Sequence, residues 1–440
     1  MLAKPSPSPE TIPAAGTLAA GESASPEPGA PEAAAVLADA GDLKGHLRNS
    51  LVRLRAGDTG MLPVVGGLIV LAVIFQSLND NFLTAGNLVN LIVQGAVYML
   101  FAMGMIFVLL IGEIDLSIGF IGGVAGVVMA ELVFGNSGVP WWVAVACGLA
   151  AGAGIGLLNG LVITIIGLPS FIVTLAGLLA WNGVMLIILG NGGTVPINDD
   201  NINNLANGLL SPTAGWVAMA LLVALFVADL LLADRRRRRR GNAVPPAGVT
   251  ILKIVTVVLA GIVVVAICNV DRGRLVPIRG VPWVLLIVLG FVTVWSVLLG
   301  RTSFGTYVYA IGGNAEAARR AGVAVNRIRV QVYVIAGLMG GVAGIVYASR
   351  LRSVSTNLDG GTLVLYCIAA SVIGGTSLFG GRGKVIHAIL GGLVIASIDN
   401  GMGLLGLSAA ARYVVTGIVL LAAVSLDALA SRGRASSGLS

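Results

Sequence analysis

The chain has 440 residues, of which 57% are hydrophobic and only 11% are charged, with 27 basic and 20 acidic side chains. Globular chains carry about 25% charged residues, so a soluble enzyme, a nucleic-acid-binding protein and a disordered scaffold are excluded. No Lys or Arg occurs between Arg55 and Arg235. A polytopic membrane protein is the class that fits these numbers.

The chain begins with a polar segment. Residues 1–60 are rich in Ala, Pro, Gly, Ser and Glu, and they predict a disordered N-terminal tail. The basic residues Lys44, Arg48, Arg53 and Arg55 stand directly before the first apolar run, which places this tail in the cytoplasm.

Residues 61–430 form the predicted transmembrane permease domain, and residues 431–440 a cytoplasmic C-terminal tail. Because a helix needs roughly 20 apolar residues to cross a bilayer, we expect an all-α polytopic fold of about twelve transmembrane helices, with ten to twelve as the range. The expected spans are 61–78, 88–112, 119–134, 140–166, 168–190, 213–232, 250–270, 283–300, 331–348, 362–380, 385–401 and 408–430.

Glycine shapes several of these spans. The segments 119–134 and 385–401 are short and interrupted by glycine, which is typical of broken or tilted helices that line a cavity. Glycines also recur at four-residue spacing, where small side chains let helix backbones approach closely in lipid. These sets are Gly119/Gly123, Gly122/Gly126, Gly152/Gly156/Gly160, Gly337/Gly341 and Gly340/Gly344.

The basic residues predict the orientation. With both termini cytoplasmic and twelve spans, 21 of the 27 basic residues fall on the inner side, as the positive-inside rule requires. The run Arg235–Arg240 lies between the spans 213–232 and 250–270. A topology anchor near anionic lipid is the favoured interpretation of this run, and a nucleic-acid patch is the alternative.

The longest inner loop after the tail, residues 301–330, contains a turn signal, then a helix-forming stretch over 315–321, then a glycine stop. A short helix on the cytoplasmic face suits docking onto another protein, and its arginines can pair with acidic groups. An ordinary amphipathic connector is the alternative. The predicted docking residues are Gly312, Gly313, Asn314, Glu316, Ala317, Ala318, Arg319, Arg320 and Gly322.

Three motifs carry a family resemblance. Residues 316–322 (EAARRAG) resemble the EAA-x-x-x-G loop of bacterial ABC importer permeases, in the version found in monosaccharide permeases of the ribose, xylose and galactose type. Residues 112–119 (GEIDLSIG) are similar to the family's G-x-I-D-L-S-V-G, with the acidic Glu113 as an unusual variant. Residues 372–383 (VIGGTSLFGGRG) resemble its G-G-T-S-x-x-G-G-x-G segment. The resemblance covers roughly residues 61–430.

The resemblance implies a type II-like ABC importer permease of the bacterial cytoplasmic (inner) membrane. Such permeases form homodimers in membrane lipid, and they work with a cytoplasmic ABC ATPase and an extracytoplasmic sugar-binding protein. ATP and Mg would bind the partner ATPase, with no cofactor or metal on this chain, and the helix of residues 316–322 would be the coupling helix. Smaller ribose-type members lack the spans near 213–232 and 250–270. Such an added pair resembles xylose-type permeases and favours a pentose, with xylose first.

ATP hydrolysis is expected on another chain. Residues 380–385 (GGRGKV) come nearest to a P-loop, but Val385 follows the lysine where Ser or Thr is needed, and the earlier glycine is missing. No catalytic dyad is evident, so we expect a transport subunit without enzymatic activity. The cysteines lie in apolar runs and are expected to be buried thiols; they are Cys147, Cys268 and Cys367.

Polar residues inside the spans are energetically costly, which makes them default candidates for a translocation pathway. The alternative for each is an interhelical hydrogen bond. These candidates are Asn90, Gln94, Asn159, Ser170, Thr174, Asn182, Ser371, Thr376, Asp399 and Asn400. Near the start of the 119–134 span, helix capping is favoured over sugar contact for Glu113, Asp115 and Ser117.

Two other functions stay open. An ABC permease for another small solute, such as a branched-chain amino acid or another sugar, would share the docking loop. An ion-coupled secondary transporter would rely on intramembrane carboxylates, for which Glu131, Asp229 and Asp399 are the further candidates. A membrane enzyme is the least favoured class.

Overall fold

The computed structural model describes residues 62–136, 138–239, 241, 244, 246–273, 275–408, 410–418, 421 and 425. The predicted tails 1–60 and 431–440 lie outside the described residues, as does most of the predicted last span after residue 418.

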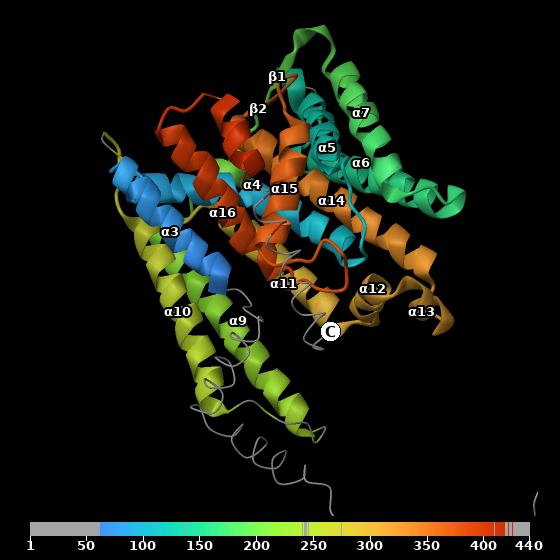
Figure 1. The fold of residues 1–440 in the computed structure, drawn as a ribbon. Coiled ribbons are helices and arrows are strands. Elements are labelled where there is room, and N and C mark those ends of the chain that lie inside the picture. Colours follow the sequence, from blue (N-terminus) through green and yellow to red (C-terminus); the bar gives the residue numbers. More distant parts are fainter. Residues whose placement is uncertain are drawn as a thin grey trace, which may run out of the picture.

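Helices make up most of the described chain (Figure 1). Short 3-10 turns follow α5 and α7 at Phe134–Asn136 and Gly190–Gly192, and a π-helical turn, Val162–Ile166, follows α6. The helices are α3 (Leu62–Leu78), α4 (Ala85–Leu110), α5 (Ile118–Val133), α6 (Trp141–Leu161), α7 (Ser170–Leu189), α8 (Asp200–Asn207), α9 (Pro212–Arg239), α10 (Ala247–Asn269), α11 (Trp283–Arg301), α12 (Ser303–Gly313), α13 (Ala315–Arg320), α14 (Val325–Leu351), α15 (Gly360–Ile373) and α16 (Ile386–Leu404).

Eight of these helices are long and apolar enough to cross a membrane, and α3, α5 and α15 are shorter apolar helices. Residues 410–418 add further helical chain inside the predicted last span. The all-α polytopic fold is thereby confirmed. Several boundaries were wrong: the predicted span 362–380 is the 14-residue α15, α9 continues to Arg239, and α14 begins at Val325. The predicted span 385–401 is the uninterrupted 19-residue α16. α15 ends early because Gly374 packs directly against the backbone of His387, so the chain turns there.

The core is built around α4 and α14, which cross in the middle of the bundle (Figure 1). In their most apolar stretches, 89% of the α4 residues and 78% of the α14 residues are buried. α5 is short but almost wholly buried, so it is an interior helix.

Glycine contacts hold α14 against α5 and α6. A Cβ at Gly152 would lie 2.6 Å from the carbonyl oxygen of Gly337, and a Cβ at Gly156 would collide with the carbonyl oxygen of Tyr333. On the α5 side, a Cβ at Gly122 would lie 2.8 Å from the carbonyl oxygen of Gly340. These helices pack backbone to backbone, as the four-residue spacing predicts.

The two ends of the bundle differ. α14 begins beside the short helices α12 and α13, and it ends beside strand β2 (Ser353–Ser355), which pairs antiparallel with β1 (Thr194–Pro196). We call the end formed by α12, α13 and the loop of residues 374–385 the docking face. β1 and β2 lie at the opposite end (Figure 1).

The predicted extra helix pair is a hairpin of α9 and α10 that projects from the bundle (Figure 1). In α9 only Gly215 is buried, and in α10 only Val265 and Cys268. The Leu210 amide donates to the Val281 carbonyl at 2.8 Å, so the chain enters and leaves the hairpin at adjacent points. Residues 235–239 of the arginine run form the last turn of α9, whereas Arg240 lies outside the described residues.

The cysteines differ in their surroundings. Cys268 and Cys367 are buried, as expected, but Cys147 is exposed. Cys147 is exposed, whereas Gly152, Gly156 and Gly160 of the same helix pack against α14. The expectation of a buried thiol was therefore wrong for Cys147, because an apolar run at the edge of a bundle also has an outward side.

Candidate functional site

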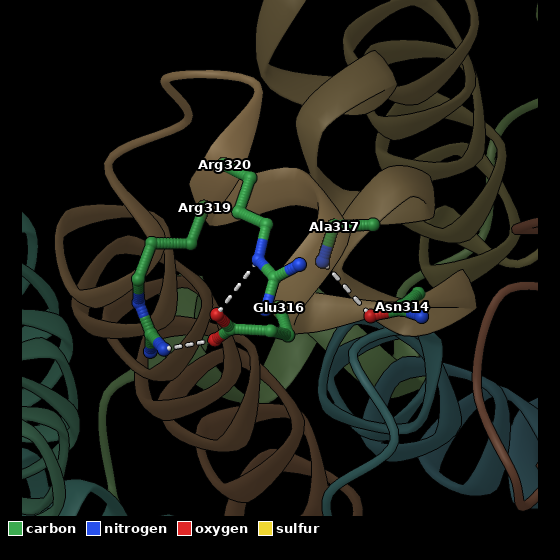
Figure 2. Close-up of polar contacts among 5 residues, drawn as sticks. All are labelled: Asn314, Glu316, Ala317, Arg319 and Arg320. Carbon is green, nitrogen blue, oxygen red and sulfur yellow. Dashed lines mark hydrogen bonds and ion pairs between the residues drawn. The ribbon is translucent and has the colours of Figure 1, made fainter. Parts of the chain in front are cut away.

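The predicted docking segment folds as two short helices, α12 and α13. Asn314 stands between them and caps α13, because its side chain accepts a hydrogen bond from the Ala317 amide at 2.9 Å (Figure 2). The predicted short helix is present and ends at Arg320, whereas the predicted turn over residues 312–314 is reduced to Asn314, because Gly312 and Gly313 are the last residues of α12. Ala318 is the buried residue of α13. The exposed side chains of α13 are Glu316, Ala317, Arg319 and Arg320.

Glu316 lies between two arginines of its own helix (Figure 2). Arg319 Nη1 is 2.7 Å from Glu316 Oε2, and Arg320 Nε is 3.3 Å from Glu316 Oε1. All three side chains are more than half exposed. Such exposed pairs contribute about 0.2–0.5 kcal/mol each. Acidic groups on a partner could therefore replace Glu316 as the ion-pair partner of these arginines at little cost in free energy.

Gly322 ends the docking helix. Its φ of +86° is in the left-handed region, where glycine is strongly favoured over residues with a Cβ. The Gly322 amide donates to the Arg319 carbonyl and the Val323 amide to the Ala318 carbonyl, each at 3.0 Å, which forms a Schellman motif. A shallow groove of about 250 Å³ opens beside it, lined by Arg319, Val323, Ala324, Val325, Asn326 and Arg327.

The docking segment and the motifs of residues 112–119 and 372–383, which lie far apart in the sequence, meet at the end of α4. The Gly381 amide donates to the Leu110 carbonyl at 2.9 Å, and a Cβ at Gly312 would collide with that same carbonyl oxygen. A Cβ at Gly380 would lie 2.8 Å from the Gly312 carbonyl oxygen and 3.1 Å from the Gly112 Cα. The docking segment is therefore in direct backbone contact with the end of α4 and with the motif of residues 372–383.

A side-chain contact strengthens this junction. The Tyr309 hydroxyl on α12 donates to the Gly383 carbonyl at 2.8 Å, and burial raises the pKa of Tyr309, which keeps it a proton donor. Thr376, a predicted pathway residue, belongs to the same loop. Its Oγ1 is 3.2 Å from His387 Nδ1, so Thr376 lies at the docking face and outside the helices.

The loop between α4 and α5 differs from the capping prediction. Asp115 is fully buried, and its Oδ1 accepts hydrogen bonds from the Ser117 amide at 2.8 Å and the Ser117 hydroxyl at 2.6 Å. Ser117 occupies the N-cap position of α5, but its side chain makes no capping bond. Glu113 does not cap α5 either, because Arg329 and Tyr333 on α14 bind its carboxylate. The predicted capping was wrong for Glu113 and for the Ser117 side chain, whereas Asp115 orders the turn into α5.

Several predicted pathway residues join this loop to neighbouring helices. Asn159 on α6 donates to the Ser117 hydroxyl oxygen at 2.9 Å. Thr174 on α7 is 3.3 Å from the Ile114 carbonyl and 2.9 Å from the Ser170 carbonyl. Residues that the sequence places on two spans thus gather around one loop, near the docking face.

A second polar cluster lies toward the opposite end, between α4 and α16. The Asp399 carboxylate accepts hydrogen bonds from the Gln94 amide and, at 2.7 Å, from the Tyr98 hydroxyl. The side chain of Asn87 donates to Asn400 Oδ1 at 2.8 Å, and Asn400 donates to Gln94 Oε1 at 3.5 Å. Three of these five residues were predicted as pathway candidates, and the structure brings them together.

A small pocket and one arginine adjoin this second cluster. Arg412 Nη1 lies 3.8 Å from Asp399 Oδ1, which places a positive charge at its edge. The pocket, which is too tight to admit a water molecule, is lined by Tyr366, Ile395, Ile398, Asp399 and Thr416. Amide, carboxylate and phenol groups beside apolar and aromatic surface are the kinds of group that orient a small polar ligand.

The remaining candidates lie apart from both clusters. Asn90 is exposed on α4, and Asn182 is half-buried on α7. Ser371 is fully buried and donates to the Cys367 carbonyl of its own helix at 2.7 Å. The same hydroxyl is 3.3 Å from the Ala102 carbonyl on α4, so Ser371 has a structural role that includes an interhelical contact.

Sequence reasoning missed Arg329, Tyr333, Tyr98 and Asn87 as members of these clusters. Arg329 and Tyr333 are four positions apart on α14, a spacing that puts them on one helix face. An unusual acidic residue at position 113 and a basic residue at the start of a span are the signals that could have paired Glu113 with Arg329. In the part of the chain that the structure describes, no group of His, Cys, Asp and Glu has the arrangement of a metal site.

A polytopic helical bundle with buried polar clusters, glycine-packed core helices and an exposed two-helix segment at one end is the architecture of a membrane permease. Residues 87–424 match the family described as branched-chain amino acid transport system / permease component. The chain belongs to this permease family, and it is a multi-pass protein of the bacterial inner membrane.

Characterised relatives are similar along most of their length. The xylose transport system permease protein XylH of Escherichia coli K12 is 35% identical over 384 residues, which cover 86% of this chain and 94% of that protein. XylH of Haemophilus influenzae is 35% identical over 366 residues, covering 82% and 94%. The ribose import permease protein RbsC of Bacillus subtilis is 35% identical over 361 residues, covering 82% and 90%. No solved structure shows a significant match.

Proposed function

We propose that this chain is the permease subunit of an ABC importer that moves a monosaccharide across the cytoplasmic membrane. A pentose is favoured, with xylose first, because of the similarity to xylose permeases along nearly their whole length and the added hairpin of α9 and α10. The observation that carries the proposal is the exposed helix α13, which presents the EAA-x-x-x-G motif at the docking face.

We propose that this chain transports the sugar together with several partners. Two copies of the permease would form a homodimer in membrane lipid, with both termini of each chain in the cytoplasm. A cytoplasmic ABC ATPase would dock on α12 and α13 and would carry ATP and Mg, and an extracytoplasmic binding protein would deliver the sugar. The exposed side chains of α13 and the adjoining groove support the docking assignment.

The cluster around Asp399 is the proposed sugar contact along the path. Its carboxylate, amide and phenol groups match the hydrogen-bonding capacity of sugar hydroxyls. It lies toward the end of the bundle opposite the docking face. A substrate that a binding protein delivers would enter at this opposite end. Gln94, Asp399 and Asn400 are therefore the pathway residues that we favour.

The docking assignment is tested by co-purification of the ATPase with the permease. We expect Glu316→Lys and Gly322→Glu to abolish ATPase co-purification while the permease stays folded. Gly322→Asn is the matched control, because asparagine tolerates the left-handed backbone and adds no charge. ATPase recovery with the charged variants equal to that of the unchanged protein would refute the assignment of α13 as the coupling helix.

The class and the substrate need separate measurements. Proteoliposomes that contain the permease, its ATPase and the binding protein should take up xylose only with ATP, and permease alone should take up none. Uptake by the permease alone, driven by a proton gradient, would instead support a secondary transporter. The description of the matched family favours a branched-chain amino acid as the second candidate substrate, so leucine uptake is measured beside xylose uptake.

A further inference from the structure

One ion pair joins the start of α14 to the loop between α4 and α5. Arg329 Nε lies 2.8 Å from Glu113 Oε1, although the N–H does not point along this line as in a hydrogen bond. The Tyr333 hydroxyl donates to Glu113 Oε2 at 2.9 Å. The Glu113 side chain is only 10% exposed, and Tyr333 is fully buried. Both carboxylate oxygens are therefore bound from a single helix.

The backbone holds Glu113 in place at the end of α4. Gly112 has a φ of +77°, its amide donates to the Leu109 carbonyl at 2.9 Å, and the Glu113 amide donates to the Val108 carbonyl at 3.1 Å. These two bonds form a Schellman motif, which gives the residue after the glycine a defined direction. Glu113 is thus attached rigidly to the helix end that also contacts Gly312 and Gly381.

At the α14 side of the ion pair, Arg329 and Tyr333 are expected to move with α13. Only residues 321–324 separate α13 from α14, and the Val323 amide is bonded back to the Ala318 carbonyl of α13. The next amides continue into α14, where that of Ile328 donates to the Ala324 carbonyl at 3.1 Å. A displacement of α13 therefore reaches the first turns of α14, where Arg329 lies.

The loop beyond Glu113 reaches three further helices. Asp115 holds Ser117 at the start of α5, and Asn159 on α6 donates to the Ser117 hydroxyl oxygen at 2.9 Å. Thr174 on α7 contacts the Ile114 carbonyl at 3.3 Å. A shift of Glu113 would therefore reach the ends of α5, α6 and α7.

We propose that Glu113 and Arg329 are positioning residues that transmit movement of the docking segment to the loop before α5. This inference rests on the proposed function, because it assumes that an ATPase moves α13. The ion pair makes the α14 start and the Glu113 loop shift as one unit. Without it, the ATPase still docks, since α13 is unchanged, but ATP hydrolysis no longer responds to delivery of the sugar.

The test measures ATP hydrolysis by the reconstituted complex of permease and ATPase, with and without binding protein loaded with xylose. We expect Glu113→Gln and Arg329→Gln to remove most of the stimulation by loaded binding protein, while ATPase co-purification stays at the unchanged level. The double variant Glu113→Arg with Arg329→Glu restores opposite charges, and it should recover part of the stimulation. Rescue of this kind separates transmission from a merely structural role.

Two further variants keep the result interpretable. Asp229→Asn removes the carboxylate of another ion pair, with Arg301, and should leave the stimulation unchanged. Tyr333→Phe removes only the hydroxyl that binds Glu113, so it should reduce stimulation less than Glu113→Gln, even if the charge variants fold poorly. Full stimulation in Glu113→Gln and in Tyr333→Phe would overturn the inference. Failure of the unchanged permease to bind any ATPase would instead refute the proposed function.

Discussion

The Gly381 amide donates a hydrogen bond to the Leu110 carbonyl at 2.9 Å, and this bond joins the loop before α16 to the end of α4. α4 is the most buried of the long helices, so its last carbonyl groups are poorly placed to find water. Gly312 packs against the same Leu110 carbonyl from the docking segment. The docking segment and the loop before α16 thus share one helix end, and a change in either should affect the other.

The Gly312 contact can be tested with a neighbouring glycine as control. Gly312→Ala places a Cβ against the Leu110 and Gly381 backbones, whereas a Cβ at Gly313 has no neighbour within 4 Å. Overpacking of this kind costs about 1–3 kcal/mol. We expect Gly312→Ala to lower the thermal unfolding temperature in detergent and to reduce uptake, and Gly313→Ala to do neither. Equal behaviour of the two variants would contradict the close junction.

The packing of α6 against α14 gives a second matched pair. Gly156→Ala would force a methyl group into the Tyr333 carbonyl, but Gly154 has open space around its Cβ position. Because alanine is favoured over glycine inside helices by up to about 1 kcal/mol, the two variants should change stability in opposite directions. The thermal unfolding temperatures of the two purified variants test whether their stabilities change in opposite directions. A stabilised Gly156→Ala variant would show that the helices do not touch here.

The Asp399 cluster makes a prediction for transport. Asp399→Asn keeps the side-chain size but removes the negative charge that faces Arg412, and it leaves one neutral oxygen to accept from Gln94 and Tyr98. Hydrogen bonds to an ionised acceptor are roughly twice as strong as those to a neutral one. We expect a higher KM for xylose uptake and a lower unfolding temperature. Asn90→Ala is the control, since Asn90 is exposed on the same α4 helix that carries Gln94. An unchanged KM in Asp399→Asn would remove Asp399 from the pathway.

The loop after α10 should depend on pH. Hydrogen bonds from the Gly273 amide and the Arg279 side chain lower the pKa of Asp271, which lies outside the membrane-spanning segments. A carboxyl with a lowered folded pKa stabilises the fold above its unfolded pKa of about 3.9, and this stabilisation is lost as pH falls through the folded pKa. We therefore expect Asp271→Asn to unfold at a lower temperature than the unchanged protein at pH 6. The difference should disappear in the most acidic buffers, and a difference that grows with acidity would contradict the assignment.

Local signals made the docking helix predictable from the sequence. Asn314 is a good N-cap, the stretch after it is rich in helix-forming residues, and Gly322 supplies the left-handed backbone at its end. The same is true of the long apolar spans, because length and hydropathy alone define them. The four-residue spacing of the small residues in α6 and α14 also predicted the close packing of these helices, because residues at this spacing lie on one helix face.

Long-range contacts explain what the sequence could not show. α15 ends at Ile373 because its end meets the His387 backbone, a contact that no local pattern encodes. Glu113 stands beside a helix start and looked like a cap, but its partner Arg329 belongs to a helix much later in the chain. The two polar clusters likewise combine residues from several spans, and hydropathy does not say which faces of those spans meet.

The backbone pairing of Leu210 with Val281 has a consequence for how such permeases diversify. The hairpin of α9 and α10 crosses the membrane twice and returns to its starting point, so its gain or loss leaves every later helix pointing in the same direction. The helix ends joined at the docking face need not be rebuilt when the hairpin is added. Larger and smaller permeases can therefore keep one transport bundle, and the hairpin can acquire its own lipid or protein contacts as an independent peripheral element.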